Sequence, residues 1–230
     1  MKNALITGAS RGLGLALARQ LALNGWGLVI DGRGRKALEK VRLELSASTK
    51  VIAIAGDITS ISHRRKLSEA AAEIGGLDAL VNNASALGPS PQPALLNYPL
   101  DVLEYVYLTN VVTPLAVIQA LYSSLRPGAC ILNVTSDAGV EAYSGWGGYG
   151  SSKAALEHLS HILAEENPEL RVYWVDPGDM NTQMLQEAFP DEDVSDRPLP
   201  EESVPGLIAL LDGEKPSGRY RAHEVVESTG

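Results

Sequence analysis

The sequence has little cysteine, little basic charge and no long apolar run. Its single cysteine, Cys130, excludes an internal disulfide and a cysteine-based zinc site. Lysine and arginine number 19 against 28 aspartates and glutamates, giving a net charge of -9. This charge argues against non-specific nucleic-acid binding, which needs basic side chains that displace counterions. The longest apolar stretches, such as Leu28–Ile30, are far shorter than the roughly 20 residues that span a bilayer.

The N-terminus lacks the features of a signal peptide. A strand-like segment follows Met1 almost at once, without a charged head, a long apolar stretch and a cleavage site. We therefore expect a cytoplasmic protein with no nucleic-acid partner, no membrane partner and no bound metal.

The composition that is present suits one globular domain. The chain has 230 residues, of which 45% are hydrophobic and 20% charged, so a sizeable core can form. No internal repeat and no break in composition divides it. We predict a single domain over residues 1–230.

Short apolar runs alternate with helical patterns along this domain. The runs are apolar almost throughout, which indicates strands buried on both faces of a parallel sheet. Between them apolar residues recur at helical spacing, as Leu13, Leu17 and Leu21 do. The order predicts an α/β fold, a doubly wound parallel sheet of about seven strands flanked by helices. The predicted strands are Ala4–Thr7, Leu28–Asp31, Val51–Ala55, Ala79–Asn82, Cys130–Thr135, Val172–Asp176 and Arg219–Ala222.

Two longer helices are expected in the second half of the chain. Residues 99–125 are rich in leucine, valine and tyrosine and predict one long helix, which Pro114 kinks or divides near its middle. Another helix is expected to begin near Tyr149 and to end near Asn167, where a proline follows.

Other segments show no regular pattern. Residues 88–93 form a proline-rich loop, and residues 180–203 are irregular and acidic. We interpret residues 183–203 as a substrate lid whose negative charge disfavours anionic substrates. His63 lies in the basic run 63–66, which we interpret as a solvated helix face.

A glycine loop follows the first predicted strand and opens the first helix. Gly8, Gly12 and Gly14 have the spacing G-x-x-x-G-x-G. Glycines let the backbone turn sharply and approach a pyrophosphate, and the helix N-terminus offers free N–H groups to the anion. The loop's place between strand and helix therefore predicts a dinucleotide site.

The residues after the second strand bear on which dinucleotide binds. An acidic side chain there binds the ribose hydroxyls of NAD, whereas an arginine accommodates the 2′-phosphate of NADP. The chain offers both in Asp31 and Arg33, with Arg11 and Arg35 nearby. Because arginine binds phosphate through paired, charge-assisted hydrogen bonds, we favour NADP(H) over NAD(H).

Tyr149 and Lys153 are four residues apart and share one face of the predicted helix. A tyrosine is a poor proton donor or acceptor at neutral pH, and a nearby cation stabilises its phenolate and lowers its pKa. Such a tyrosine can give a proton to a carbonyl oxygen or take one from an alcohol. Ser136 ends a predicted strand, at the edge where open α/β sheets bind ligands.

Together these residues resemble the short-chain dehydrogenase/reductase family, from Asn3 to about Thr182. The glycine loop matches its T-G-x-x-x-G-x-G motif, residues 82–84 match N-N-A, and Tyr149 with Lys153 matches Y-x-x-x-K. Ser85 departs from the family's glycine, and the C-terminal segment 216–223 departs from the family's usual ending.

The resemblance implies a Rossmann fold and a set of roles. Tyr149 is the expected general acid or base, Lys153 lowers its pKa and binds the nicotinamide ribose, Ser136 orients the substrate carbonyl and Asn110 supports the proton path. The residues expected to bind the cofactor are Thr7, Gly8, Ser10, Arg11, Gly12, Leu13, Gly14, Arg33, Asp57, Ile58, Asn83, Ala84, Tyr149, Lys153, Pro177, Gly178 and Thr182.

The implied function is an NADP(H)-dependent oxidoreductase that acts on a small carbonyl or secondary alcohol. Two other readings stay open: a non-catalytic sensor of the cofactor with a protein partner, and a reaction through a transient ketone without net cofactor consumption. The resemblance also implies a homodimer or homotetramer, paired through the helices at 99–125 and 149–167.

Overall fold

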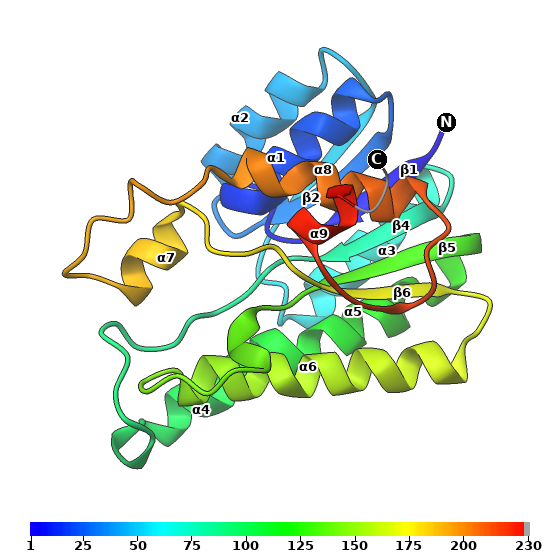
Figure 1. Cartoon of the computed structure of the whole chain (residues 1–230). Helices are drawn as coiled ribbons and strands as arrows, with labels where there is room; N and C mark the ends of the chain where they lie inside the picture. The colour runs from blue at the N-terminus through cyan, green and yellow to red at the C-terminus, as the bar shows by residue number, and fades with distance from the viewer. Residues whose placement is uncertain (228–230) are drawn as a thin grey trace.

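The structure, a computed structural model, describes residues 1–227, and its strands form one parallel sheet. The strand order is β3-β2-β1-β4-β5-β6-β7 (Figure 1). This confirms the predicted doubly wound α/β fold, with strand bounds within two residues of those expected, except that β5 begins five residues before the predicted Cys130. The strands are β1 (Asn3–Ile6), β2 (Gly27–Gly32), β3 (Val51–Ala55), β4 (Leu77–Asn82), β5 (Leu125–Val134), β6 (Arg171–Asp176) and β7 (Gly218–Arg221).

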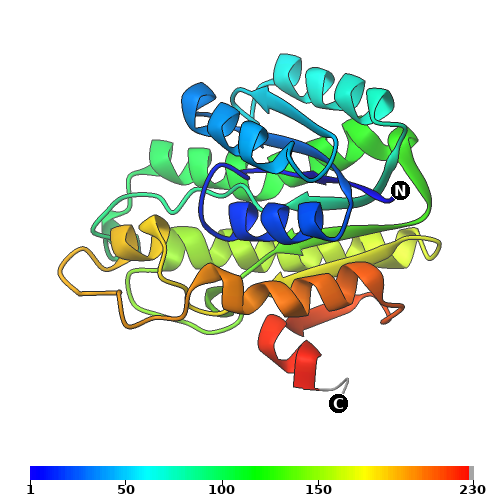
Figure 2. The same cartoon turned by 90° about the horizontal axis from the view of Figure 1, so that it is seen from above.

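Helices cover both faces of this sheet (Figure 2). Successive residues of a strand point to opposite faces, so Leu28 and Ile30 join the core under one helical layer and Val29 joins the other. One layer is built on α1, α2 and α8, and the other on α3, α5 and α6. The helices are α1 (Gly12–Leu23), α2 (Arg35–Leu45), α3 (Ile61–Glu73), α4 (Leu100–Tyr107), α5 (Thr113–Leu121), α6 (Gly147–Glu166), α7 (Gln183–Ala188), α8 (Pro200–Asp212) and α9 (Ala222–Glu227).

The strand order reverses between β1 and β4, which are neighbours in the sheet. The loops after these strands leave toward opposite helical layers and open a crevice at the carboxyl edge. The glycine loop follows β1 at this point, so the topology places the predicted dinucleotide site where such sheets bind ligands.

The predicted long helix is continuous but not uniform. Between α4 and α5 the residues Leu108–Val112 form a π-helical turn, and Tyr122–Ser124 add a 3-10 turn. Pro114 is the second residue of α5. Because proline has no N–H to donate, the wider turn just before it is where the regular hydrogen-bond ladder is interrupted.

This helical stretch corrects the statement that the apolar segments are too short to span a membrane. Leu100–Ser124 is a helix of 25 residues with a mean hydropathy of 1.3, long and apolar enough by those measures alone. Its residues Val117, Ile118 and Leu121 are buried in the core between sheet and helices. The buried share of its most apolar window is 44%, and the α5 part packs on the sheet as a core helix does.

The prediction that residues 180–203 are irregular is wrong at both ends. Helix α7 lies inside this segment, and α8 begins at Pro200. Pro200 is the first residue of α8, where its missing N–H leaves no helical bond unmade, and the Glu202 carboxylate accepts the Leu199 N–H at 2.9 Å. In Figure 1, α7 stands out from the layers on the side of the carboxyl edge.

Candidate functional site

The glycine loop makes its turns at positions where only glycine fits. Gly8 and Gly12 have φ angles of +68° and +55°, in the left-handed region that favours glycine. A Cβ on Gly14 would lie 2.5 Å from Asn83 Nδ2 and 2.7 Å from the Gly8 oxygen. The first turn of α1 therefore packs directly on the end of β1, and its N–H groups face the crevice.

Residues after β4 hold this loop from behind. The Thr7 hydroxyl accepts the backbone N–H groups of Asn83 and Ala84, at 2.9 and 3.0 Å. The Asn83 side-chain amide donates to the carbonyls of Thr7 and Gly8, at 2.8 and 3.2 Å. The N-N-A segment thus fixes the shape of the glycine loop through four hydrogen bonds.

Asp31 is also part of this support. Its carboxylate accepts the Gly8 N–H at 2.7 Å through one oxygen, and the other lies 2.9 Å from His63 Nε2. Asp31 and His63 are 2% and 4% exposed. The interpretation of His63 as part of a solvated face is therefore wrong, since α3 turns this side chain toward β2. Both oxygens of Asp31 are thus engaged within the fold, and the residue also lines the cavity.

The end of the crevice beside β2 contains an exposed arginine. Arg33 lies on the rim, just past the end of β2. The Thr59 backbone N–H, 2.9 Å from Asp57 Oδ1, holds the pKa of Asp57 below its usual range, and the charge of Arg33 adds to this. A Cβ on Gly32 would lie 3.0 Å from Ser10 Oγ, so the wall beside Arg33 is tightly packed.

Tyr149 and Lys153 lie one turn apart on α6, both buried. Lys153 Nζ is 5.4 Å from the Tyr149 ring centroid and donates to the Val134 carbonyl at 2.8 Å. Burial raises the pKa of the Tyr149 phenol above its usual range, and a hydrogen bond with Ser85 acts against this. Burial lowers the pKa of Lys153 to about 8, and Glu157 acts in the opposite sense. The pair thus combines a protonated phenol with an ammonium group that is still charged at neutral pH.

Ser136 follows β5 beside this pair. Its hydroxyl donates to Asp137 Oδ1 at 2.9 Å and accepts the Ala138 N–H at 3.2 Å. The other oxygen of Asp137 accepts the Tyr143 hydroxyl at 3.0 Å. Asp137 was not predicted as a site residue. The one signal for it in the sequence is its position directly after Ser136.

Asn110 lies in the π-helical turn and is 1% exposed. Its side-chain amide donates to the Ala86 carbonyl and the Ser152 hydroxyl, both at 2.9 Å. Its oxygen accepts the Ala86 N–H at 2.8 Å. The side chain therefore joins the loop after β4 to α6, behind Tyr149 rather than on the wall of the crevice.

One cavity of about 1140 Å³ connects the two ends of the site. Thr7, Gly14 and Asn110 do not line it and act from behind its wall. The substrate end adds Tyr143, Trp146, Met184 and Phe189, with Trp146 packed 5.7 Å from both Tyr149 and Phe189. The predicted residues on the wall are Gly8, Ser10, Arg11, Gly12, Leu13, Arg33, Asp57, Ile58, Asn83, Ala84, Ser136, Tyr149, Lys153, Pro177, Gly178 and Thr182.

The residues present fit a dinucleotide. The glycine loop leaves a cradle that Cβ atoms would fill, and the N-terminus of α1 points its N–H groups into it. Pro177 and Gly178, after β6, line the far end, and Thr182 caps α7 by accepting the Leu185 N–H at 3.2 Å. Fold and site together define a dinucleotide-binding α/β oxidoreductase.

Comparison with known proteins gives the family. The sequence pattern of the short chain dehydrogenase family matches residues 2–193. The rhamnolipids biosynthesis 3-oxoacyl-[acyl-carrier-protein] reductase of Pseudomonas aeruginosa is 36% identical over 193 residues, which cover 80% of this chain and 74% of that protein. The chain belongs to the short-chain dehydrogenase/reductase family and is an NAD(P)-dependent oxidoreductase.

Solved structures agree over nearly the whole chain. One from Pseudomonas syringae, described as a short chain dehydrogenase, has a TM-score of 0.90 and 30% identity, covering 96% of this chain and 94% of that one. Another, from Shigella flexneri and complexed with NADP, has a TM-score of 0.88 and 26% identity, covering 96% and 97%.

Proposed function

We propose that this protein is an NADP(H)-dependent reductase that interconverts a small carbonyl compound and its secondary alcohol. The observation that carries the proposal is the joint placement of Tyr149, Lys153 and Ser136 on the wall of the cavity that the glycine loop also lines. When bound, the nicotinamide supplies or accepts the hydride. The chain's own residues hold the substrate and move the proton.

In this proposal Tyr149 gives its proton to the substrate oxygen, and Ser136 orients that oxygen by a hydrogen bond. The raised pKa of Tyr149, caused by burial, keeps the phenol protonated. This is the state needed for reduction, whereas oxidation of the alcohol by the same group requires the phenolate. The Lys153 ammonium stabilises the phenolate that is left behind.

Replacement of one hydroxyl tests this assignment. In NADPH oxidation assays with a panel of aldehydes, ketones and diketones, Tyr149→Phe is expected to lose at least about a hundredfold in kcat. Its NADPH dissociation constant stays within about twofold. Ser151→Ala, which removes an exposed hydroxyl from the same helix, is the matched control and keeps its activity. Near-normal turnover of Tyr149→Phe would disprove the assignment.

The preference for NADP(H) rests on two side chains. Arg33 lies on the rim where the second ribose of a dinucleotide is expected, whereas Asp31, which also lines the cavity, already has its two carboxylate oxygens engaged by Gly8 and His63. The NADP complex of the Shigella flexneri relative supports the same choice. We expect Arg33→Ala to weaken NADPH binding about tenfold or more in a fluorescence titration, with NADH binding unchanged.

Arg35→Ala is the matched control, because Arg35 begins α2 and does not line the cavity. Equal losses of NADPH affinity in Arg33→Ala and Arg35→Ala would reject the NADP assignment. Tighter binding of NADH than of NADPH by the wild-type protein would reject it as well. If no carbonyl is reduced while NADPH binds tightly and a specific protein partner is found, the sensor function replaces this proposal.

We further propose a cytoplasmic homodimer or homotetramer. Leu108 and Val112 on the π-helical turn and Ile162 on α6 are apolar and 41%, 54% and 45% exposed. Burial of such a stripe against a second copy would remove it from water.

A further inference from the structure

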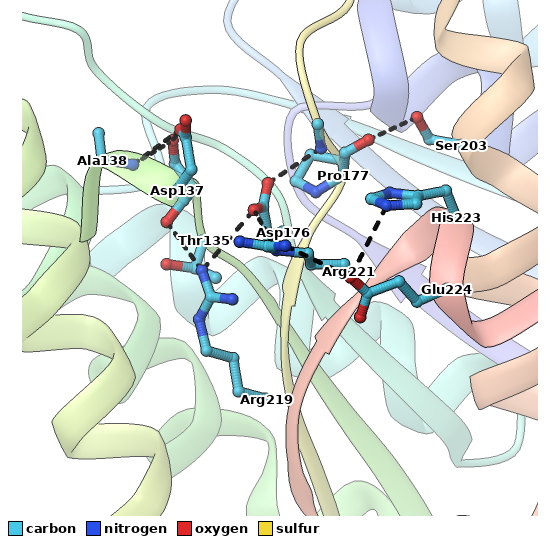
Figure 3. Close-up of polar contacts among 12 residues, drawn as sticks. Thr135, Asp137, Ala138, Asp176, Pro177, Ser203, Arg219, Arg221, His223 and Glu224 are labelled. Atoms are coloured by element: carbon cyan, nitrogen blue, oxygen red, sulfur yellow. Dashed lines mark hydrogen bonds and ion pairs between the residues drawn. The ribbon is translucent and has the colours of Figure 1, made fainter. Parts of the chain in front are cut away.

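The last strand carries Arg219 into the back of the catalytic site. Arg219 lies on β7, and its Nε is 3.1 Å from both carboxylate oxygens of Glu157. One terminal nitrogen donates to the Ser136 carbonyl at 3.3 Å and lies 3.7 Å from Asp176 Oδ2. Figure 3 shows the guanidinium groups of Arg219 and Arg221 converging on the Asp176 carboxylate. A single side chain therefore connects α6, β6 and the residue that follows β5.

Each group that Arg219 contacts adjoins a residue of the proposed machinery. Glu157 lies one helical turn beyond Lys153 and accepts the Thr135 hydroxyl at 2.7 Å. Asp176 is 5% exposed and accepts the Gly178 N–H at 2.9 Å, which shapes the loop at the nicotinamide end. The third contact is the backbone of Ser136 itself.

The two carboxylates also act on the proton-transfer pair. Asp176, together with Asp137, adds to the burial that raises the pKa of Tyr149. Glu157 opposes the burial that lowers the pKa of Lys153. Both are negative charges that a neighbouring cation offsets.

Arg221 is the other cation at Asp176, and its place differs. It is 4.0 Å from Asp176 Oδ2, also pairs with Glu224 at 3.3 Å, and is 47% exposed. Within the described residues, Arg221 makes no hydrogen bond or ion pair with Ser136 or Glu157. Solvent therefore screens Arg221 more strongly than Arg219, which is 25% exposed.

We propose that Arg219 is a positioning residue of the catalytic site, which holds the backbone of Ser136 and offsets the charges of Glu157 and Asp176 around Tyr149 and Lys153. The proposal rests on the proposed function. It assigns a role to the C-terminal segment, the part of the chain that departs from the family pattern.

Three substitutions separate the hydrogen bonds from the charge. Arg219→Met removes both, Arg219→Lys keeps the charge without the planar fork, and Arg219→Gln keeps a neutral amide donor at the place of Nε, toward Glu157, without charge. Arg221→Met removes a charge from the same strand and is the matched control. The measurement is the pH dependence of kcat/KM for oxidation of a secondary alcohol with NADP+, with the thermal unfolding midpoint recorded for each variant.

We expect Arg219→Met to lose about tenfold or more in kcat with cofactor affinity within about twofold. Its acid limb should move to higher pH by about half a unit, because loss of a nearby positive charge raises both apparent pKa values of the Tyr149–Lys153 pair. Arg219→Lys should return the acid limb of the kcat/KM profile to its wild-type pH but recover only part of kcat. Arg219→Gln should recover part of kcat and leave the acid limb at the higher pH. Arg221→Met should move the acid limb less than Arg219→Met does.

An acid limb that stays at the same pH in Arg219→Met, whether or not kcat falls, overturns the proposal. Arg219 would then only stabilise the edge strand β7. If Arg219→Met does not fold, the comparison of Arg219→Lys with Arg219→Gln decides, and identical limbs overturn the proposal. If the wild-type protein turns over no substrate, the proposed function fails. The Arg219 role is then tested by the ultraviolet absorbance titration of the Tyr149 phenolate in the NADP+ complex. The Tyr149 signal is obtained by subtracting the titration of Tyr149→Phe, both in the wild-type protein and in Arg219→Met, and its pKa is compared between the two.

Discussion

Asp31 shows how contacts within the fold can engage a carboxylate that lines a candidate ligand site. At the end of β2 it is placed to reach a cofactor, yet its two oxygens bind the Gly8 N–H and His63 inside the protein. A buried charge with both oxygens engaged is stable only while its partners remain. The energetic importance of His63 therefore depends on Asp31.

A double-mutant cycle measures this dependence. His63→Leu should lower the free energy of unfolding by about 2–3 kcal/mol, because it leaves a buried carboxylate oxygen unpaired. The same change in an Asp31→Asn background should cost less by about 1 kcal/mol or more. Urea unfolding of the four proteins gives these values. Additive losses would show that the two side chains are not coupled.

Lys153 gives the cofactor-free protein a distinct pH dependence. Its folded-state pKa is about 8 against an ordinary 10.5, so between these values the folded protein binds fewer protons than the unfolded chain. The free energy of unfolding contributed by this group therefore rises with pH in that window. Tyr149, with its pKa raised by burial, acts in the opposite sense only above its ordinary 10.0.

Between pH 8 and 10 the wild-type protein should thus gain about 2 kcal/mol relative to Lys153→Met. Urea unfolding across this range is the measurement, with the exposed Lys66→Met as control. Parallel pH profiles for wild type and Lys153→Met would contradict the lowered pKa.

The proposed catalytic residues could be singled out in the sequence because their spacing along the chain is local. Tyr149 and Lys153 share a helix face, and the glycine loop is contiguous. His63 was misread from its charged neighbours, although Leu67, Ala70 and Ile74 follow it at helical spacing on the buried side of α3. Arg219 could not be predicted, because its contacts come from residues 43 to 83 positions away.

At the scale of elements, strands were easier to predict than the helices near the C-terminus. Apolar runs are required in any strand buried on both faces, so most strand limits show directly in the sequence, whereas the less buried start of β5 does not. Helix α8 was not predicted, because Pro200, Glu201 and Glu202 at its start suggested a loop. Proline at a first helical position and acids in a first turn instead favour a helix.

Helix α7 and its flanks form the acidic wall of the substrate end. Asp137, Asp179 and Glu187 line the cavity there, and burial together with the charge of Asp137 raises the pKa of Asp179. The role of residues 183–203 as a substrate lid stays a prediction. The charge alone makes a prediction, since negative walls repel anions at short range.

We expect kcat/KM for a keto acid to be about tenfold or more below that for its neutral ester, with the gap narrowing at high salt. Asp179→Asn should narrow the gap, whereas Asp212→Asn, which removes a charge outside the cavity, should not. Equal activity on the acid and the ester would contradict this prediction.

At the scale of the whole molecule, the proposed oligomer would bury the exposed apolar residues of the π-helical turn. The apolar stripe on the π-helical turn is continuous with a buried core helix, so a charge placed on its exposed side need not disturb folding. Leu108→Glu with Val112→Glu should therefore produce a folded monomer. Light scattering after size-exclusion chromatography measures the mass.

Leu43→Glu is the control for that experiment, since Leu43 is 61% exposed on α2 and belongs to the opposite helical layer. It should keep the oligomer. A monomeric wild-type protein, or an oligomer that survives the double substitution, would reject the proposed interface.

The tight packing beside Arg33 bears on how this enzyme's descendants can evolve. A change of coenzyme would place an acid at Gly32, yet a Cβ there meets Ser10 Oγ at 3.0 Å, within the glycine loop. A lone Gly32→Asp step would therefore crowd the pyrophosphate cradle before it gained a new ribose ligand. Under the proposed preference for NADP(H), the effect of a substitution at position 32 is therefore coupled to the side chain at position 10, which must shift by a few tenths of an ångström to admit it.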